Sequence, residues 1–266
     1  MISLYSGKQQ IELKTFNFPS GEPHIEIPDG LVLMSDESDL TVTWRFNGKI
    51  DGLFRIAMLK NILDNECSSD RVINLELPFF PCARQDRHTL QGQPFSVEVV
   101  ASIINSMNWS KVTVFDPHSD VLVDELNNCH VVTQLECLKT TTAVDMNLYS
   151  AIVAPDKGSI KKASSIANEY DLPLIVCNKV RNPSTGKLTS FEVIDKPDIE
   201  LSKVLVVDDI CDGGGTFIGV ACAIEDALQV SKIDLYVTHG LFTKGFDSLL
   251  EHYNAIHCCF NYQLLD

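Results

Sequence analysis

The chain has 266 residues, of which 45% are apolar, and a formal net charge of −15. This length suffices for one large domain or for two domains of ordinary size. The acidic balance argues against nucleic acid as a partner, because phosphate backbones need positive protein surfaces. No apolar run is long enough to span a bilayer, which argues against a membrane partner. The first seven residues lack the charged and apolar regions of a signal peptide.

The nine cysteines are scattered, without a C-x-x-C pair or a regular spacing. Disulfide frameworks are typical of small secreted domains, so we expect reduced thiols and a cytoplasmic protein. The adjacent pair Cys258–Cys259 is typical of core packing rather than of chemistry.

Strand and helix patterns alternate along the chain. Apolar and β-branched runs predict strands at 31–34, 40–46, 71–77, 111–115, 151–154, 173–177, 204–207 and 233–237. Apolar periodicity predicts helices at 53–63, after Pro94, at 158–170 and at 216–229. This alternation predicts an α/β fold with mostly parallel sheets covered by helices. We expect two similar halves, residues 1–140 and 141–266.

The strand at 204–207 leads into an acidic, glycine-rich turn. Asp208 and Asp209 follow the apolar run, then Asp212, three glycines (213–215) and Thr216 at a helix start. Backbone N–H groups of such a turn can bind phosphate, and the paired carboxylates can accept hydrogen bonds from ribose hydroxyls. The structural alternative is an ordinary turn with Asp212 or Thr216 as helix N-cap. It leaves the clustered acids unexplained, so the sequence favours a phosphorylated-sugar site.

Other predicted strands also end in charged groups. Arg84-Gln85-Asp86-Arg87 follows the strand at 71–77. Arginine forks suit phosphate oxygens and a glutamine can recognise a base edge, although a solvated loop is the simpler interpretation of this segment alone. Ligands of open α/β sheets bind beyond the carboxyl ends of the strands, so we expect one site shared by both halves.

Three further segments carry groups suited to phosphate or metal chemistry. His118 and Asp156, which follow the strands at 111–115 and 151–154, are candidates to hold one Mg²⁺. The basic loop 178–186, with Lys179 and Arg181, is either a mobile hairpin or a lid over a phosphoryl group. No Walker A or G-x-G-x-x-G sequence occurs, which argues against P-loop nucleotidases and dinucleotide-binding dehydrogenases.

Together these motifs resemble the ribose-phosphate pyrophosphokinases (phosphoribosyl pyrophosphate synthetases), in a short, phage-like form. The matching segments run in the family's order over nearly the whole chain: Phe18–Glu22, Ala83–Arg87, Asp116–His118, Pro155–Gly158, Lys179–Arg181, Asp208–Thr216 and Thr238–Gly240. The resemblance implies two phosphoribosyltransferase-like, Rossmann-like halves.

The resemblance also implies an activity, the Mg²⁺-dependent transfer of the β,γ-diphosphate of ATP to the anomeric hydroxyl of ribose 5-phosphate. By position it implies that ATP is bound by Arg84, Gln85, Asp86, Arg87 and His118, and by Phe18 and Glu22 of a neighbouring subunit. It implies a ribose-phosphate site formed by Asp208, Asp209, Asp212, Gly213, Gly214, Gly215 and Thr216. Lys179, Arg181 and His118 would be catalytic, His118 and Asp156 would serve Mg²⁺, and the protein would be a homo-oligomer of at least two chains.

Two departures from the family pattern keep alternatives open. Ser20 stands where the family has Asn or Asp, and Gly213 where it has Thr. The opening at Gly213 motivates a second acceptor, ADP-ribose, which would place the enzyme in NAD salvage. A non-catalytic regulatory relative and a base-using phosphoribosyltransferase are less favoured, because Lys179, Arg181, His118, Asp156 and the Arg84–Arg87 segment are all present.

Overall fold

The computed structural model describes residues 1–28, 38–88, 90–181, 188–228 and 230–263, with the backbone alone for residues 181, 188 and 189. The strand predicted at 31–34 and residues 182–186 of the basic loop lie outside the described residues. The chain divides into two compact units, Met1–Val132 and Thr133–Leu264. The sequence had suggested a division after residue 140.

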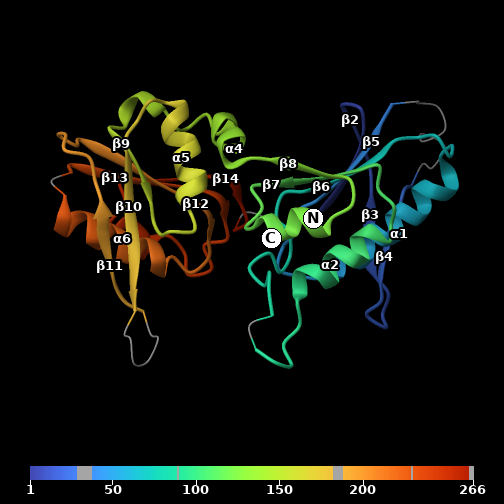
Figure 1. Ribbon diagram of the computed structural model, residues 1–266. Helices are drawn as coiled ribbons and strands as arrows, with labels where there is room; N and C mark the ends of the chain where they lie inside the picture. Colours follow the sequence, from blue (N-terminus) through green and yellow to red (C-terminus); the bar gives the residue numbers. More distant parts are fainter. Residues whose placement is uncertain (29–37, 89, 182–187, 229, 264–266) are drawn as a thin grey trace. The chain divides into compact units, whose positions relative to one another are not determined.

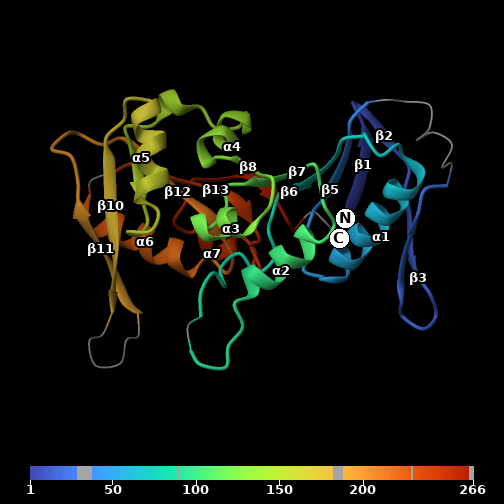
Figure 2. The same ribbon diagram turned by 45° about the vertical axis from the view of Figure 1, so that its right-hand side comes forward.

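The first unit is built on a six-stranded sheet of order β2-β1-β5-β6-β7-β8 (Figure 1). Its strands are β1 (Ile2–Ser6), β2 (Gln9–Ile11), β5 (Leu40–Trp44), β6 (Ile73–Leu77), β7 (Lys111–Phe115) and β8 (Cys129–Val132). β5 to β8 are parallel, and β1 runs antiparallel to both of its neighbours. A separate hairpin, β3 (Lys14–Asn17) and β4 (Pro23–Glu26), ends in a free-standing turn (Figure 2).

The helices of the first unit are α1 (Asp51–Glu66), α2 (Ser96–Asn105) and α3 (Asp120–Glu125). α1 and α2 pack their apolar faces on the sheet in one core. Ile56 of α1 and Ile104 of α2 are fully buried there with Leu75 of β6. This packing fixes the carboxyl ends of β6 and β7, from which the Arg84–Arg87 and His118 segments emerge.

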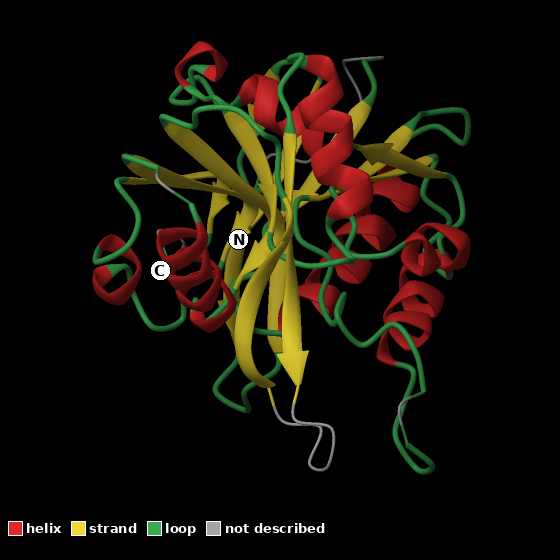
Figure 3. Cartoon of the chain, turned by 60° about the vertical axis from the view of Figure 1, so that its left-hand side comes forward, coloured by secondary structure: helices red, strands yellow, loops and turns green. Residues whose placement is uncertain are grey.

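The second unit carries a sheet of order β11-β10-β9-β12-β13-β14. Its strands are β9 (Ala151–Ala154), β10 (Leu174–Arg181), β11 (Leu188–Asp195), β12 (Lys203–Cys211), β13 (Lys232–Gly240) and β14 (Ala255–Asn261). Five of the six are parallel, and β11 pairs antiparallel with β10 in a long hairpin (Figure 3). The helices are α4 (Gln134–Thr140), α5 (Ile160–Glu169), α6 (Gly215–Ala227) and α7 (Asp247–Leu250), with a 3-10 turn, η2 (Met146–Leu148).

The central strand β12 is buried on both faces. Val204 and Val206 point into the core under α6, whereas Leu205 and Val207 point into the core under α5, and all four are fully buried. Figure 1 shows α5 and α6 on opposite sides of this sheet. Successive strand residues face opposite ways, so a continuous apolar run is what a doubly covered strand requires. The predicted α/β fold with mostly parallel sheets is confirmed.

Two properties expected from composition can be compared with the structure. All nine cysteines are free thiols. Among the described residues, no helix combines the length and the apolar content that crossing a bilayer would require.

Candidate functional site

The acidic turn of the second unit joins β12 to α6. Gly214 is the N-cap residue of α6 and has a φ of +77°, a left-handed conformation that favours glycine. A methyl group on Gly214 would lie 3.2 Å from the side chain of Leu249. The N-cap residue is Gly214, which has no side chain to cap α6, so neither Asp212 nor Thr216 is the N-cap residue. The helix N-terminus thus presents backbone N–H groups, a geometry suited to an anion.

Asp208 and Asp209 lie side by side at the carboxyl end of β12. Asp209 is buried, and the Nζ of Lys162, from α5, lies 3.4 Å from its Oδ2. Burial and the neighbouring charge of Asp209 raise the pKa of Asp208 well above its usual value. A hydrogen bond from the Asp209 N–H to Asp208 Oδ1, at 2.9 Å, opposes this rise. Two adjacent carboxyl groups in this position can accept hydrogen bonds from hydroxyl groups.

Asp156 and Lys179 form an ion pair beside these acids. Lys179 Nζ lies 2.5 Å from Asp156 Oδ2. The other oxygen of Asp156 accepts hydrogen bonds from the N–H groups of Gly158 (2.8 Å) and Ser159 (3.2 Å), which fixes the carboxylate after β9. The charge of Asp156 also contributes to the raised pKa of Asp208, so the three acids share one environment. Arg181 ends β10, and its side chain lies outside the described part of the chain.

The sequence analysis missed three residues of this site. Lys162 contacts Asp209, Thr243 Oγ1 donates to Asp212 Oδ1 at 2.7 Å, and the methylene groups of Lys244 lie beside Gly213. Lys162 lies one turn into a predicted helix, and Thr243 and Lys244 follow a predicted strand end. The only signal in the sequence for Thr243 and Lys244 is that ligands bind near strand ends in such sheets.

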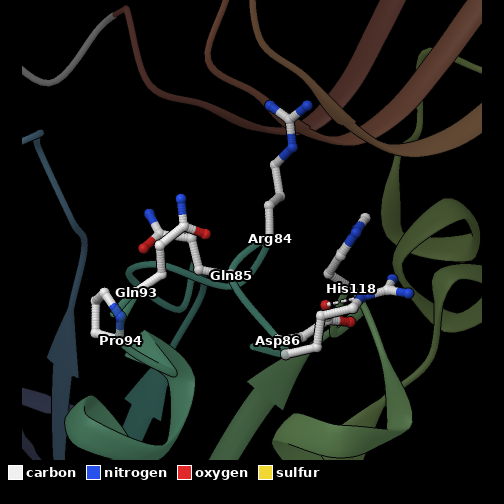
Figure 4. Close-up of a pocket in the computed structure, with 7 residues that line it drawn as sticks. Arg84, Gln85, Asp86, Gln93, Pro94 and His118 are labelled. Atoms are coloured by element: carbon white, nitrogen blue, oxygen red, sulfur yellow. Dashed lines mark hydrogen bonds and ion pairs between the residues drawn. The ribbon is translucent and has the colours of Figure 1, made fainter. Parts of the chain in front are cut away.

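The first unit holds a cavity of about 550 Å³ at the carboxyl ends of β6 and β7 (Figure 4). Its lining residues are Arg84, Gln85, Asp86, Arg87, Gln93, Pro94 and His118. Figure 4 shows Arg84, Gln85, Gln93 and His118 projecting from the backbone toward the same side. The structure thus brings together five of the residues predicted to bind ATP. Gln93 and Pro94 line the cavity in addition.

Asp86 and His118 face this cavity from two different loops. Burial raises the pKa of the Asp86 carboxyl. The neighbouring Ser119 hydroxyl and Arg87 guanidinium together lower that pKa by more, so the net pKa lies below its usual value. Arg87 Nε donates to Asp86 Oδ1 at 3.2 Å. The loop that carries His118 begins at Asp116, which is buried and has a φ of +43°. The cavity therefore combines cationic donors with an ionised carboxylate.

The remaining predicted residues lie elsewhere. Phe18 and Glu22 are on the turn between β3 and β4, where Phe18 N–H donates to the Glu22 carbonyl at 2.9 Å. Ser20 Oγ donates to Glu22 Oε2 at 2.6 Å. His118 and Asp156 belong to different units, so a metal ion shared by them stays a prediction.

The Thr238–Gly240 segment belongs to the core instead of to the surface. Thr238 and His239 are buried, and His239 stacks on Phe260 with ring centroids 5.8 Å apart. A methyl group on Gly240 would lie 2.0 Å from the ring of Phe242, so only glycine leaves room for that buried ring.

Comparison with known proteins places these features in a class. Residues 141–241 match the phosphoribosyl transferase domain family. The structure resembles the crystal structure of phosphoribosylpyrophosphate synthetase from Mycobacterium smegmatis, with a TM-score of 0.75 over 91% of this chain and 78% of that chain, at 20% identity. The chain therefore shares the fold of that synthetase, and most of its second unit is similar to the phosphoribosyl transferase domain.

Curated proteins show a more particular similarity. The chain is 32% identical over 181 residues to the ribose-phosphate pyrophosphokinase of Mycoplasma genitalium, covering 65% of this chain and 52% of that protein. It is 24% identical to the enzyme of the same name from Pyrococcus abyssi, covering 92% and 81%. The chain spans about half the length of the Mycoplasma relative that it matches. The chain is similar to the ribose-phosphate pyrophosphokinases, so the predicted resemblance is confirmed.

Proposed function

We propose that the protein transfers the β,γ-diphosphate of ATP to the anomeric hydroxyl of ribose 5-phosphate. The observation that carries the proposal is the turn after β12, where Asp208 and Asp209 precede the glycine-capped N-terminus of α6. A ribose 5-phosphate needs both features, hydroxyl acceptors for the sugar and N–H donors for the phosphate. The names of the curated relatives support the same reaction and do not favour ADP-ribose as acceptor.

The reaction makes one P–O bond and breaks another, and the acceptor hydroxyl loses its proton to solvent. The anomeric oxygen attacks the β-phosphorus of ATP, the bond between that phosphorus and the α–β bridging oxygen breaks, and AMP leaves. Asp208 and Asp209 orient the acceptor, and Lys179, after leaving Asp156, neutralises charge on the group in transfer. Arg181, at the end of β10, and His118, on the loop after β7, are proposed to assist the transfer.

The cavity of the first unit is the proposed ATP site. Arg84 and Arg87 supply forks for phosphate oxygens, and Gln85 and Gln93 supply amides that can recognise the edge of a base. Oxygen donors such as the carboxylate of Asp156 suit Mg²⁺, which would supply charge neutralisation to the diphosphate. The free state of all nine thiols supports a cytoplasmic location.

The direct test is AMP release from ATP and Mg²⁺, run in parallel with ribose 5-phosphate, ADP-ribose, unphosphorylated ribose and no acceptor. We expect AMP with ribose 5-phosphate and a matching amount of phosphoribosyl pyrophosphate. AMP with ADP-ribose alone would reject the proposed acceptor and keep the proposed transfer. The absence of AMP in every arm would reject the transfer itself.

A further inference from the structure

A lysine lies against the glycine-rich turn of the second unit. A methyl group built on Gly213 would lie 3.4 to 3.7 Å from three methylene carbons of Lys244. The lysine side chain therefore runs along the face of the turn that Gly213 leaves without a side chain. Its ammonium group is one bond beyond the nearest of those carbons, which brings a cation to the turn.

Backbone contacts place Lys244 there. Thr243 N–H donates to the Asp212 carbonyl at 3.0 Å, and Thr243 Oγ1 donates to Asp212 Oδ1 at 2.7 Å. The N–H groups of Leu241 and Phe242 both donate to the carbonyl of Cys211, at 2.8 and 3.1 Å. These hydrogen bonds hold the segment after β13 against the end of β12 and the turn that follows it. Lys244 is the next residue after Thr243.

The charged groups around the turn indicate what the ammonium group of Lys244 could do. Lys162 lies beside Asp209 and Lys179 beside Asp156, so both lysines stand at the sugar end of the site among carboxylates. Among the described residues, no ion pair involves Lys244, whose side chain is exposed. A chain with a net charge of −15 that binds a phosphate dianion needs a local cation at the phosphate end.

We propose that Lys244 binds the 5-phosphate of the acceptor sugar, an inference that rests on the proposed function. The ammonium adds a charge-assisted hydrogen bond to the N–H donors of the turn and of α6. Lys244 is then a specificity residue, which makes the site select a phosphorylated sugar over the free sugar. The competing explanation is a solvated surface lysine that has no part in binding.

The test compares Lys244→Met, which keeps the methylene chain and removes the charge, with Lys244→Arg, which keeps the charge. Lys232→Met is the matched control, because Lys232 is an exposed lysine at the opposite end of β13. We expect Lys244→Met to raise the KM for ribose 5-phosphate by about 10- to 100-fold, the value of a hydrogen bond to a charged group. Lys244→Arg should stay within about threefold of the wild type, and the KM for ATP should not change in either variant.

Two further readouts separate binding from a structural role. The affinity of the wild type for ribose 5-phosphate should fall with added salt more steeply than that of Lys244→Met, since one screened contact is missing. The KM for unphosphorylated ribose should be the same in both. An equal loss for ribose and ribose 5-phosphate, or an unchanged KM for ribose 5-phosphate, would overturn the assignment.

Calorimetric titration of the full-length protein with ribose 5-phosphate distinguishes this inference from the proposed function. If the wild type releases no AMP but binds ribose 5-phosphate and Lys244→Met does not, the proposed reaction fails and the role of Lys244 stands. If the wild type is active and both proteins bind ribose 5-phosphate equally, the reaction stands and the role of Lys244 is rejected.

Discussion

The native protein disfavours the charged form of the Asp208 carboxyl group. Burial and the charge of Asp209 raise its pKa, so the native protein binds a proton more tightly than the unfolded chain does. The contribution of this group to stability is therefore greatest below the pKa of an unfolded Asp and is lost as pH rises through the raised native pKa. The charged form of Asp208 thus disfavours folding at neutral pH.

Asp208→Asn should stabilise the protein at neutral pH by about 0.5–2 kcal/mol, because the amide carries no charge into the buried site. The gain in free energy of unfolding should shrink as pH falls toward 4, and the affinity for ribose 5-phosphate should drop. Thermal unfolding at several pH values measures the first effect. Asp198→Asn, on an exposed turn, serves as a control that should show neither. A stability gain that did not depend on pH would contradict the argument.

Lys179 pairs with Asp156, and its proposed role is to neutralise charge that develops in the transition state. Lys179→Ala should lower kcat by about 10²- to 10³-fold with a small change in the KM for ATP, because the lost contact strengthens as charge develops. Initial-rate kinetics on AMP release provide the measurement, with Lys232→Ala as the control. A raised KM at unchanged kcat would make Lys179 a binding residue only.

At the scale of elements, the connection between β12 and α6 depends on one left-handed glycine. Gly214 has a positive φ and lies against Leu249, whereas Gly215, the first residue of α6, has open space where a methyl group would go. Gly214→Ala should lower the free energy of unfolding by about 1–3 kcal/mol, the cost of the left-handed conformation and of the contact with Leu249. Gly215→Ala should leave it nearly unchanged, which urea denaturation can check. Equal effects would show that the φ of Gly214 does not limit stability.

Elements with strong local patterns were predictable. The strands at 111–115 and 151–154 match β7 and β9, and the helices at 158–170 and 216–229 match α5 and α6 to within a few residues. β12 and β13 extend beyond their apolar runs to Cys211 and Gly240, because backbone pairing between them continues into the polar residues. The short helices α3 and α4 have no apolar periodicity strong enough to predict them from the sequence. The same holds for strands such as β11, whose position depends on pairing with β10.

The residues of the candidate site could be predicted from the sequence better than the contacts between them. Charged residues at strand ends identified the turn after β12 and the cavity beside His118, since parallel strands bring their ends to one edge. The contacts of Lys162 with Asp209 and of Lys244 with Gly213 join segments far apart in the chain. Such pairings follow from tertiary packing, and an isolated lysine in a sequence does not show them.

At the scale of the whole molecule, the β3–β4 hairpin carries aromatic side chains that do not line the cavity described in the same unit. Phe16, Phe18 and His24 form a cluster with ring centroids 5.0 to 5.3 Å apart, and Phe18 is 44% exposed. An exposed aromatic side chain can stack on a base. If Phe18 completes the ATP site of a neighbouring copy, as the family resemblance implies, then each site contains residues from two chains.

Mixing two inactive variants tests that arrangement. Phe18→Ala should impair the site that it reaches in the neighbouring copy, and Lys179→Ala should impair the site of its own chain. In a dimer that carries one of each, both changes fall in the same site and the other site is intact. Equal amounts, unfolded and refolded together, should therefore recover about a quarter of wild-type activity, since half of the random dimers are mixed and each has one intact site.

The outcome separates the two geometries because they distribute the damage differently. If Phe18 served the ATP site of its own chain, every site of a mixed dimer would carry one change, and mixing would restore nothing. Refolding each variant by itself gives the background that the mixture must exceed. Light scattering of each sample establishes that a dimer or larger assembly is present, without which complementation has no physical basis. Recovery near a quarter would thus establish both an oligomer and a site that depends on two copies of the chain.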